Sequence, residues 1–340
     1  MYTRVDDLGW KQSNAFKKAF SVDVPIEFIG VWDTVNSVGL IPRRLPFTTS
    51  NTIVRTFRHA VSLDERRAKF KANLWNRPTP QEAALGVDGQ KPDAPPVARR
   101  QTELKKRKPT RENTLRAMET KYSGAADRPT DIEEVWFAGC HCDVGGGSVD
   151  NDTPHSLARI ALRWMIRECF KADSGITFIS DDLRRLGLDP ANLYPYVLPR
   201  PPALPVAGAQ IQHIPSPETQ KLQNFANVDN LVQVDKSEEE HEILDALSPI
   251  YDQLSLKWGW WVLELIPVKQ RYQKSDNTWE SSHAWNLGQG RFIPKQKKSV
   301  IKVHRSVKIR MEAQYPDGTK YIPKASFATA LARGNLQWVD

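Results

Sequence analysis

Two polar residues, Asp33 and His141, follow apolar runs that have the length of β-strands. Asp33 comes directly after residues 24–32, and His141 comes directly after residues 135–140. Such nearly continuous apolar runs are typical of strands buried on both faces of a parallel sheet. The carboxyl ends of these strands meet at one edge, where substrates bind. A carboxylate that orients an imidazole there favours general base catalysis, so we expect Asp33 and His141 to share a pocket as catalytic acid and histidine.

Each of the two residues also has a purely structural interpretation. Asp33 could cap the turn that follows it, and His141, which precedes the three glycines 145–147, could be a packed histidine. Two other histidines compete for the role of base. We expect His59 to lie on a helix, which favours packing, and His304 to lie on the polar face of a strand, which favours a solvated or an interface role.

A serine nucleophile does not accompany the pair. Hydrolases of this kind place the serine on a sharp strand-to-helix turn, Gly-x-Ser-x-Gly, upstream of the acid and the histidine. The 340 residues contain no such sequence. Ser37-x-Gly39 and Gly147-Ser148 are the nearest fragments, and Ser148 also follows the histidine.

Metal, nucleotide and thiol chemistry are not indicated either. Cys140, His141 and Cys142 lack the paired spacing of a structural zinc site, and the glycines 145–147 do not form a phosphate-binding loop. A cysteine nucleophile beside His141 is disfavoured because neighbours on a strand point to opposite faces. We therefore expect no cofactor and no metal.

The elements that position these residues follow from the spacing of apolar residues. We predict helices over residues 10–20, 51–75 and 237–254, a further helix that begins at Thr153 and stops near Gly175, buried strands over 24–32 and 135–140, a surface loop over 195–217 and an amphipathic strand over 300–311. A strand, a loop with a site residue and a helix in succession are typical of an α/β fold.

The composition indicates a globular chain with one exceptional segment. The chain is 40% hydrophobic and 26% charged, with a formal net charge of +8. Prolines and a basic run at 99–111 predict that residues 76–130 are a disordered insertion or a long surface loop. Three cysteines favour a reducing compartment. The most apolar run, 258–268, is too short to span a bilayer, and no secretory signal is visible, so we expect a cytoplasmic protein.

Two segments carry a resemblance to a known family. They are Phe28–Gly39, with Trp32-Asp33-Thr34 at its centre, and Val135–Gly147. Together they resemble the uncharacterised α/β-hydrolase domain related to the catalytic domain of type VI secretion phospholipase effectors. Trp260-Trp261-x-Leu263-Glu264 and His304-Arg305-Ser306-Val307 are similar to the fungal form. The resemblance implies phospholipid ester hydrolysis, with Asp33 as the triad acid and His141 as the triad histidine.

The resemblance also implies that the serine lies upstream of Met1. The expected fold is then an α/β-hydrolase-like, three-layer, mostly parallel sheet that lacks its N-terminal strands and the nucleophile turn. Residues 1–180 would be a partial catalytic domain, and 181–340 a C-terminal extension of helices and antiparallel strands packed on it. We expect the chain alone to be inactive, and to be poorly soluble because the strands at 24–32 and 135–140 would lose neighbours.

Two other functions remain open at this point. The chain could be a non-catalytic module that binds membranes or partners through a basic and aromatic surface, with residues 99–111 on anionic lipid. Nucleic-acid binding through the same run is supported by charge alone. For the leading interpretation we expect a phospholipid or another ester at a membrane surface as the partner, and no specific nucleic acid.

Overall fold

A computed structural model describes residues 7–22, 24–35, 54–75, 130–206, 208–215, 236–273, 279–297 and 299–340. The chain divides into two compact units. The first consists of Met1–Glu27, Val38–Arg55 and Asn76–Asp131, and the second of Phe28–Ser37, Thr56–Trp75 and Ile132–Asp340. Both residues of the expected acid–histidine pair belong to the second unit.

The first unit contains helix α1 (Asp7–Phe20), which confirms the helix expected over 10–20. Its Phe16 and Phe20 rings lie 5.0 Å apart, one helical turn from each other. The basic run at 99–111 and nearly all of the insertion expected at 76–130 lie outside the described residues.

A five-stranded sheet forms the centre of the second unit. Its order is β1-β2-β3-β6-β7, with β1 (Ile26–Trp32), β2 (Val54–Ser62), β3 (Asp131–Phe137), β6 (Ile301–His304) and β7 (Leu336–Val339). Strand β6 pairs in parallel with β3 on one side, where Trp136 faces Val303, and with β7 on the other. The sheet is mostly parallel with flanking helices, so the expected α/β architecture is confirmed.

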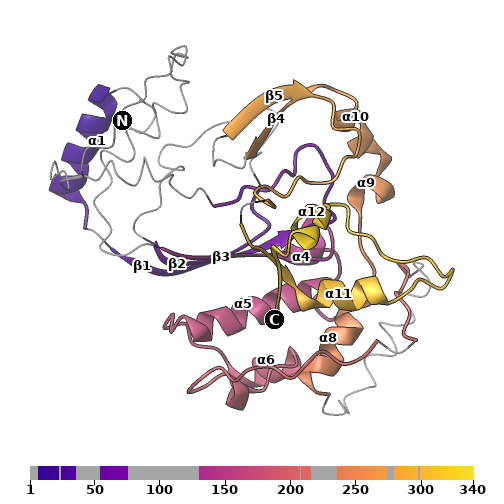
Figure 1. The fold of residues 1–340 in the computed structure, drawn as a ribbon. Helices are drawn as coiled ribbons and strands as arrows, with labels where there is room; N and C mark the ends of the chain where they lie inside the picture. Colours follow the sequence, from indigo (N-terminus) through magenta and orange to yellow (C-terminus); the bar gives the residue numbers. More distant parts are fainter. Residues whose placement is uncertain are drawn as a thin grey trace, which may run out of the picture. The chain divides into compact units, whose positions relative to one another are not determined.

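Helix α5 (Leu157–Lys171) packs on one face of this sheet (Figure 1). Leu157, Ile160 and Trp164 are buried at spacings of three and four residues, so they lie on one face of the helix. The Trp164 ring meets Phe137 of β3 at a centroid distance of 5.5 Å. Buried side chains of this size contribute roughly 1.5–3 kcal/mol each. The predicted helix is confirmed, although it begins at Leu157 and not at Thr153, which lies in a preceding turn.

The helix expected over 51–75 is wrong, because Val54–Ser62 form strand β2. Every residue of this strand except Arg55 is buried, since neighbouring strands and packed elements cover it. The charges of Arg58 and His59 obscured this in the sequence. Burial of Arg58 is possible because Glu168 of α5, 110 residues away, accepts a hydrogen bond from its Nε atom.

The strand expected over 300–311 is confirmed only for Ile301–His304. The chain then turns into helix α11 (Arg305–Glu312), where Ser306 N donates a hydrogen bond to His304 Nδ1. This capping bond pairs a backbone amide that has no partner within the helix, because it lies in the first turn.

The helix expected over 237–254 is also divided. Ser237 caps α8 (Glu238–Ala246) by accepting a hydrogen bond from Glu240 N, and a second, short helix, α9 (Gln253–Leu256), follows. Pro249 lies between them and cannot donate the backbone hydrogen bond that a continuous helix requires.

The remaining elements are short. They are α4 (His141–Gly145), α6 (Ser180–Arg185), η1 (Pro190–Asn192), η2 (Trp258–Trp260), α10 (Trp261–Glu264), β4 (Val268–Gln273), β5 (Trp279–Ala284) and α12 (Ala328–Ala332). Strands β4 and β5 form an antiparallel pair. Within the described residues, no helix is both long and apolar enough to cross a membrane.

The expected loss of neighbours is contradicted for strand β3. Strand β3 lies between β2 and β6, so the expectation that it lacks a neighbour is wrong. The C-terminal half of the chain supplies that neighbour, because β6 starts at Ile301. Strand β1 stands at the end of the strand order.

Candidate acid–histidine site

The ends of β1 and β3 bring Asp33 and His141 together. Asp33 follows the last residue of β1 in a left-handed conformation, with φ of 44°, and its amide donates a hydrogen bond to Ala60 O at 2.7 Å. His141 is the first residue of α4, which follows β3 after three residues. The distance from Asp33 Oδ2 to His141 Nδ1 is 2.7 Å. The proximity that the two apolar runs predicted is confirmed.

The carboxylate of Asp33 is fully buried and remains ionised. Burial would raise its pKa, but the guanidinium of Arg291 and the hydrogen bonds from His141 and Ser62 N hold the pKa well below its usual range. An ionised carboxylate accepts hydrogen bonds only, so His141 Nδ1 is the donor. The other ring nitrogen, Nε2, is then left as a proton acceptor.

Arg291 is the residue of this site that the sequence analysis missed. It lies 258 residues from Asp33 and binds both carboxylate oxygens, Oδ2 through Nη2 at 2.8 Å and Oδ1 through Nη1. It also donates hydrogen bonds to Phe70 O at 3.0 Å and to Ser62 Oγ at 2.8 Å. The side chain is buried. No local pattern marks Arg291, because its role depends on contacts with three distant segments.

The ring of His141 is positioned by aromatic and charged neighbours. Its centroid lies 5.0 Å from that of Phe70, which in turn meets Trp260 at 5.7 Å. The Arg67 guanidinium lies over the Phe70 ring at 3.5 Å and is paired with Glu65 at 2.8 Å. Glu65 also accepts a hydrogen bond from His141 N at 3.2 Å. Both the backbone and the ring of His141 are therefore held in place.

The two competing histidines are packed in the interior. His59 is fully buried on β2, with its ring nitrogens near Glu134 Oε1 at 3.2 Å and Thr34 Oγ1 at 2.9 Å. Packing was expected for His59, although on a helix. The expectation of solvent exposure for His304 is wrong, because its ring is buried and stacks on Phe137 at 4.8 Å. Burial lowers the pKa of His304 to about 3.

The cysteines beside His141 are poor nucleophiles. Burial raises the pKa of both the Cys140 and the Cys142 thiols, which disfavours the reactive thiolate. In the part of the chain that the structure describes, no group of three or more metal-ligating side chains is gathered as a metal site.

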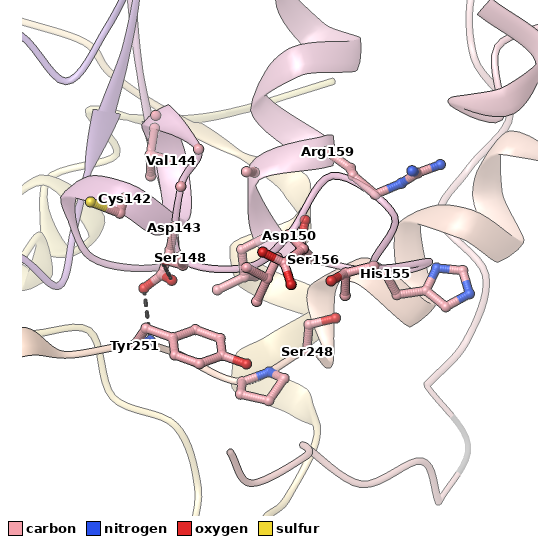
Figure 2. A pocket seen from close by; sticks show the side chains of 18 of the residues that line it. Cys142, Asp143, Val144, Ser148, Asp150, His155, Ser156, Arg159, Ser248 and Tyr251 are labelled. Carbon is pink, nitrogen blue, oxygen red and sulfur yellow. Dashed lines mark hydrogen bonds between the residues drawn. The ribbon is translucent and has the colours of Figure 1, made fainter. Parts of the chain in front are cut away.

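A cavity of about 840 Å³ opens next to the pair. Its lining includes Trp32, which precedes Asp33, and Cys142, which follows His141, but not Asp33 and His141 themselves. Much of the remaining wall is apolar, with Val144, Leu157, Leu162, Leu186, Ile214 and Pro249. Figure 2 shows the Tyr251 side chain among those that line the cavity.

Asp143 anchors the cavity wall next to His141. Its carboxylate accepts hydrogen bonds from Ser148 Oγ at 2.7 Å, Cys140 N at 2.9 Å and Tyr251 N at 3.0 Å (Figure 2). Burial raises the pKa of Asp143 to about 6 despite these bonds. The aspartate thereby fixes the glycine-rich segment after α4 to the loop that carries Tyr251.

Comparison with known proteins relates the range that contains Asp33 and His141 to a family of enzymes. Residues 4–168 match the family model described as T6SS, phospholipase effector Tle1-like, catalytic domain. The family resemblance is confirmed. Asp33, His141 and the strands that precede them all lie inside the matched range.

One curated relative matches most of the chain. The chain is 28% identical over 395 residues to the uncharacterized protein YEL023C of Saccharomyces cerevisiae, and the match covers 89% of this chain and 57% of that protein. The chain therefore spans little more than half the length of this relative. No solved structure matches the 340-residue chain.

Proposed function

We propose that Asp33 and His141 are the acid and the base of a serine ester hydrolase of the Tle1-like phospholipase type, built on an α/β-hydrolase fold. The observation that supports this most is the buried, ionised carboxylate that lies 2.7 Å from His141 Nδ1. The pair lies in the range that matches the phospholipase effector family.

In this reaction, His141 Nε2 takes the proton of a serine hydroxyl while the serine oxygen attacks the ester carbonyl carbon. The imidazolium then gives the proton to the departing alcohol as the carbon–oxygen ester bond breaks, which leaves an acyl-serine. Water, deprotonated by the same nitrogen, then attacks the acyl carbon. The imidazolium returns this proton to the serine oxygen as the acyl–serine bond breaks, which frees the carboxylic acid and the serine. Asp33 stabilises the imidazolium in each half of the cycle.

The serine of this mechanism does not come from a Gly-x-Ser-x-Gly sequence of these 340 residues, since they contain none. We propose that the serine lies outside them and that the 340-residue chain alone does not hydrolyse esters. The cavity beside Trp32 and Cys142 would hold an acyl chain, because its wall is largely apolar and it is lined by the sequence neighbours of Asp33 and His141.

The test compares two proteins, the 340-residue chain and a longer form extended upstream of Met1 by the sequence encoded there. Hydrolysis of p-nitrophenyl esters and of phospholipid vesicles is measured for both. We expect hydrolysis by the longer form only, and in that form Asp33→Asn and His141→Ala should each lower kcat by roughly 10³- to 10⁴-fold. His283→Ala, at an exposed histidine of β5, is the matched control and should leave kcat unchanged.

Undiminished hydrolysis by the His141→Ala form would contradict the assignment. A longer form that folds cooperatively but hydrolyses neither substrate would favour the non-catalytic binding module instead. Circular dichroism and thermal unfolding of each variant separate loss of chemistry from loss of fold.

A further inference from the structure

Large apolar side chains are exposed on a surface formed by α9, η2, α10 and the loop 285–292. This surface, called the tryptophan surface below, includes side chains whose exposed fractions reach 81% for Trp258, 62% for Trp285 and 64% for Phe292. Its members are Leu256, Trp258, Trp261, Val262, Leu265, Ile266, Trp285, Leu287 and Phe292. Exposed apolar groups concentrated in this way mark a site of interaction.

Hydrogen bonds hold the two segments of the tryptophan surface together. The buried carboxylate of Glu264, on α10, accepts bonds from Gly288 N at 2.9 Å and from Asn286 Nδ2, and it also accepts one from Ala68 N at 2.6 Å. Trp261 Nε1 donates to Leu254 O of α9 at 3.0 Å. The apolar side chains are therefore carried by a fixed backbone, and their exposure is a property of the folded unit.

Lys257 is the exposed charged residue in the segments 253–266 and 285–292 of the tryptophan surface. Glu264 is the only acidic residue in the segments 253–266 and 285–297, and it is buried. Lys257 lies between Leu256 and Trp258, two of the exposed apolar residues. Tryptophan favours the boundary between lipid and water, where its ring is buried and its N–H donates a hydrogen bond to water. Cations beside it attract anionic head groups, with about 1 kcal/mol for each lysine near the surface.

The tryptophan surface is continuous with the acid–histidine site. Trp260 of η2 meets Phe70, and Phe70 meets His141. On the other segment, the exposed Phe292 directly follows Arg291, whose guanidinium holds Asp33. A lipid layer in contact with this surface would lie next to the imidazole. A protein partner seated there would cover the approach to it.

We propose that the tryptophan surface docks on an anionic phospholipid bilayer, with its apolar side chains in the head-group region and Lys257 on the lipid phosphates. The identification of the bilayer lipids as the ester substrate rests on the proposed function. Docking itself requires no hydrolysis, so it can be tested on the 340-residue chain.

The experiment is flotation of the 340-residue chain with phosphatidylcholine vesicles that contain or lack phosphatidylserine. We expect the double variant Trp258→Ser/Trp285→Ser to lower the partition coefficient at least about tenfold on both kinds of vesicle. Lys257→Gln should lower it about fivefold, and only where phosphatidylserine is present. Tyr196→Ser, at a site 80% exposed outside this surface, is the matched control and should float like the parent chain.

Equal flotation of the parent chain and the double tryptophan variant would overturn the proposal. So would a parent chain that does not float but forms a dimer by light scattering that the double variant loses, because the surface would then join two copies. His141→Ala should float like the parent chain. In the longer form, the double variant should hydrolyse vesicles more slowly but soluble esters at the parent rate, so failure of docking is distinguishable from failure of the catalytic assignment.

Discussion

Removal of the Arg291 guanidinium is the sharpest perturbation of the acid–histidine site. Arg291→Met keeps most of the volume of the side chain but leaves the carboxylate of Asp33 buried without its cation. Breaking a buried ion pair from one side costs about 3–5 kcal/mol, because the remaining charge has neither water nor a partner. We therefore expect the unfolding equilibrium constant to rise by a factor of about 10² to 10⁴ at pH 7.

The pH dependence of this loss has a defined sign. In the parent chain the pKa of Asp33 is held low, so its stabilising contribution is present at pH 7 and is lost only as the pH falls through that low value. In Arg291→Met burial dominates, and the pKa of Asp33 rises above its ordinary value of 3.8. The folded variant then takes up a proton in acid, and the difference in stability between the two proteins should shrink between pH 7 and pH 4.

Urea denaturation followed by tryptophan fluorescence measures this difference. The matched control is Arg333→Met, at an exposed arginine after α12, for which we expect a change within about 0.5 kcal/mol. A loss at Arg291 that is no larger than at Arg333, or a loss that stays constant between pH 7 and pH 4, would refute the ion-pair reasoning.

Two further predictions concern the loop after β3 and the core. Gly139→Ala places a Cβ atom 2.5 Å from Asp143 Cβ at a φ of 110°, whereas Gly147→Ala, at a φ of 91°, meets no atom within 4 Å. Chemical denaturation should therefore show a backbone cost of about 1–3 kcal/mol at both positions and a further 1–3 kcal/mol at Gly139 alone; equal losses would contradict the contact. The second prediction concerns His304. Burial lowers the pKa of its ring from 6.5 to about 3, so as the pH falls the histidine is protonated in the unfolded chain before it is protonated in the folded chain. The stability from its neutral ring is present above pH 6.5 and is lost towards pH 3, so His304→Phe should flatten the dependence of stability on pH between 6.5 and 4.5 by up to about 1.4 kcal/mol per pH unit. An unchanged slope would mean that His304 is not the buried titrating group.

Expectations drawn from short, continuous patterns agree best with the structure. The apolar runs before Asp33 and His141 form β1 and β3, and the apolar spacing of residues 157–165 forms α5. Each pattern reflects which residues of one element are buried. In a parallel sheet, the residues that follow the strands lie at the same edge of the sheet. The sequence therefore suffices to predict that the two side chains lie close together.

Polar side chains in the interior were the main source of error. Arg58 and His59 made β2 resemble a helix, and the buried Ser306 and Arg310 made α11 resemble the continuation of a strand. Such residues are buried or partly covered only because distant groups satisfy them, as Glu168 does for Arg58. A pattern within one segment contains no information about a partner that lies 110 residues away.

Local spacing alone therefore specified the α/β class, the presence of two of its strands and the aspartate and histidine that follow them. The folded chain decided the rest, namely the guanidinium of Arg291 that keeps Asp33 ionised, the Phe70 and Trp260 rings beside His141, and the exposure of the tryptophans next to them. The physical reason is that ionisation and exposure depend on which groups surround a side chain in space. Those groups come from segments up to 258 residues apart, which only the closed tertiary structure brings into contact.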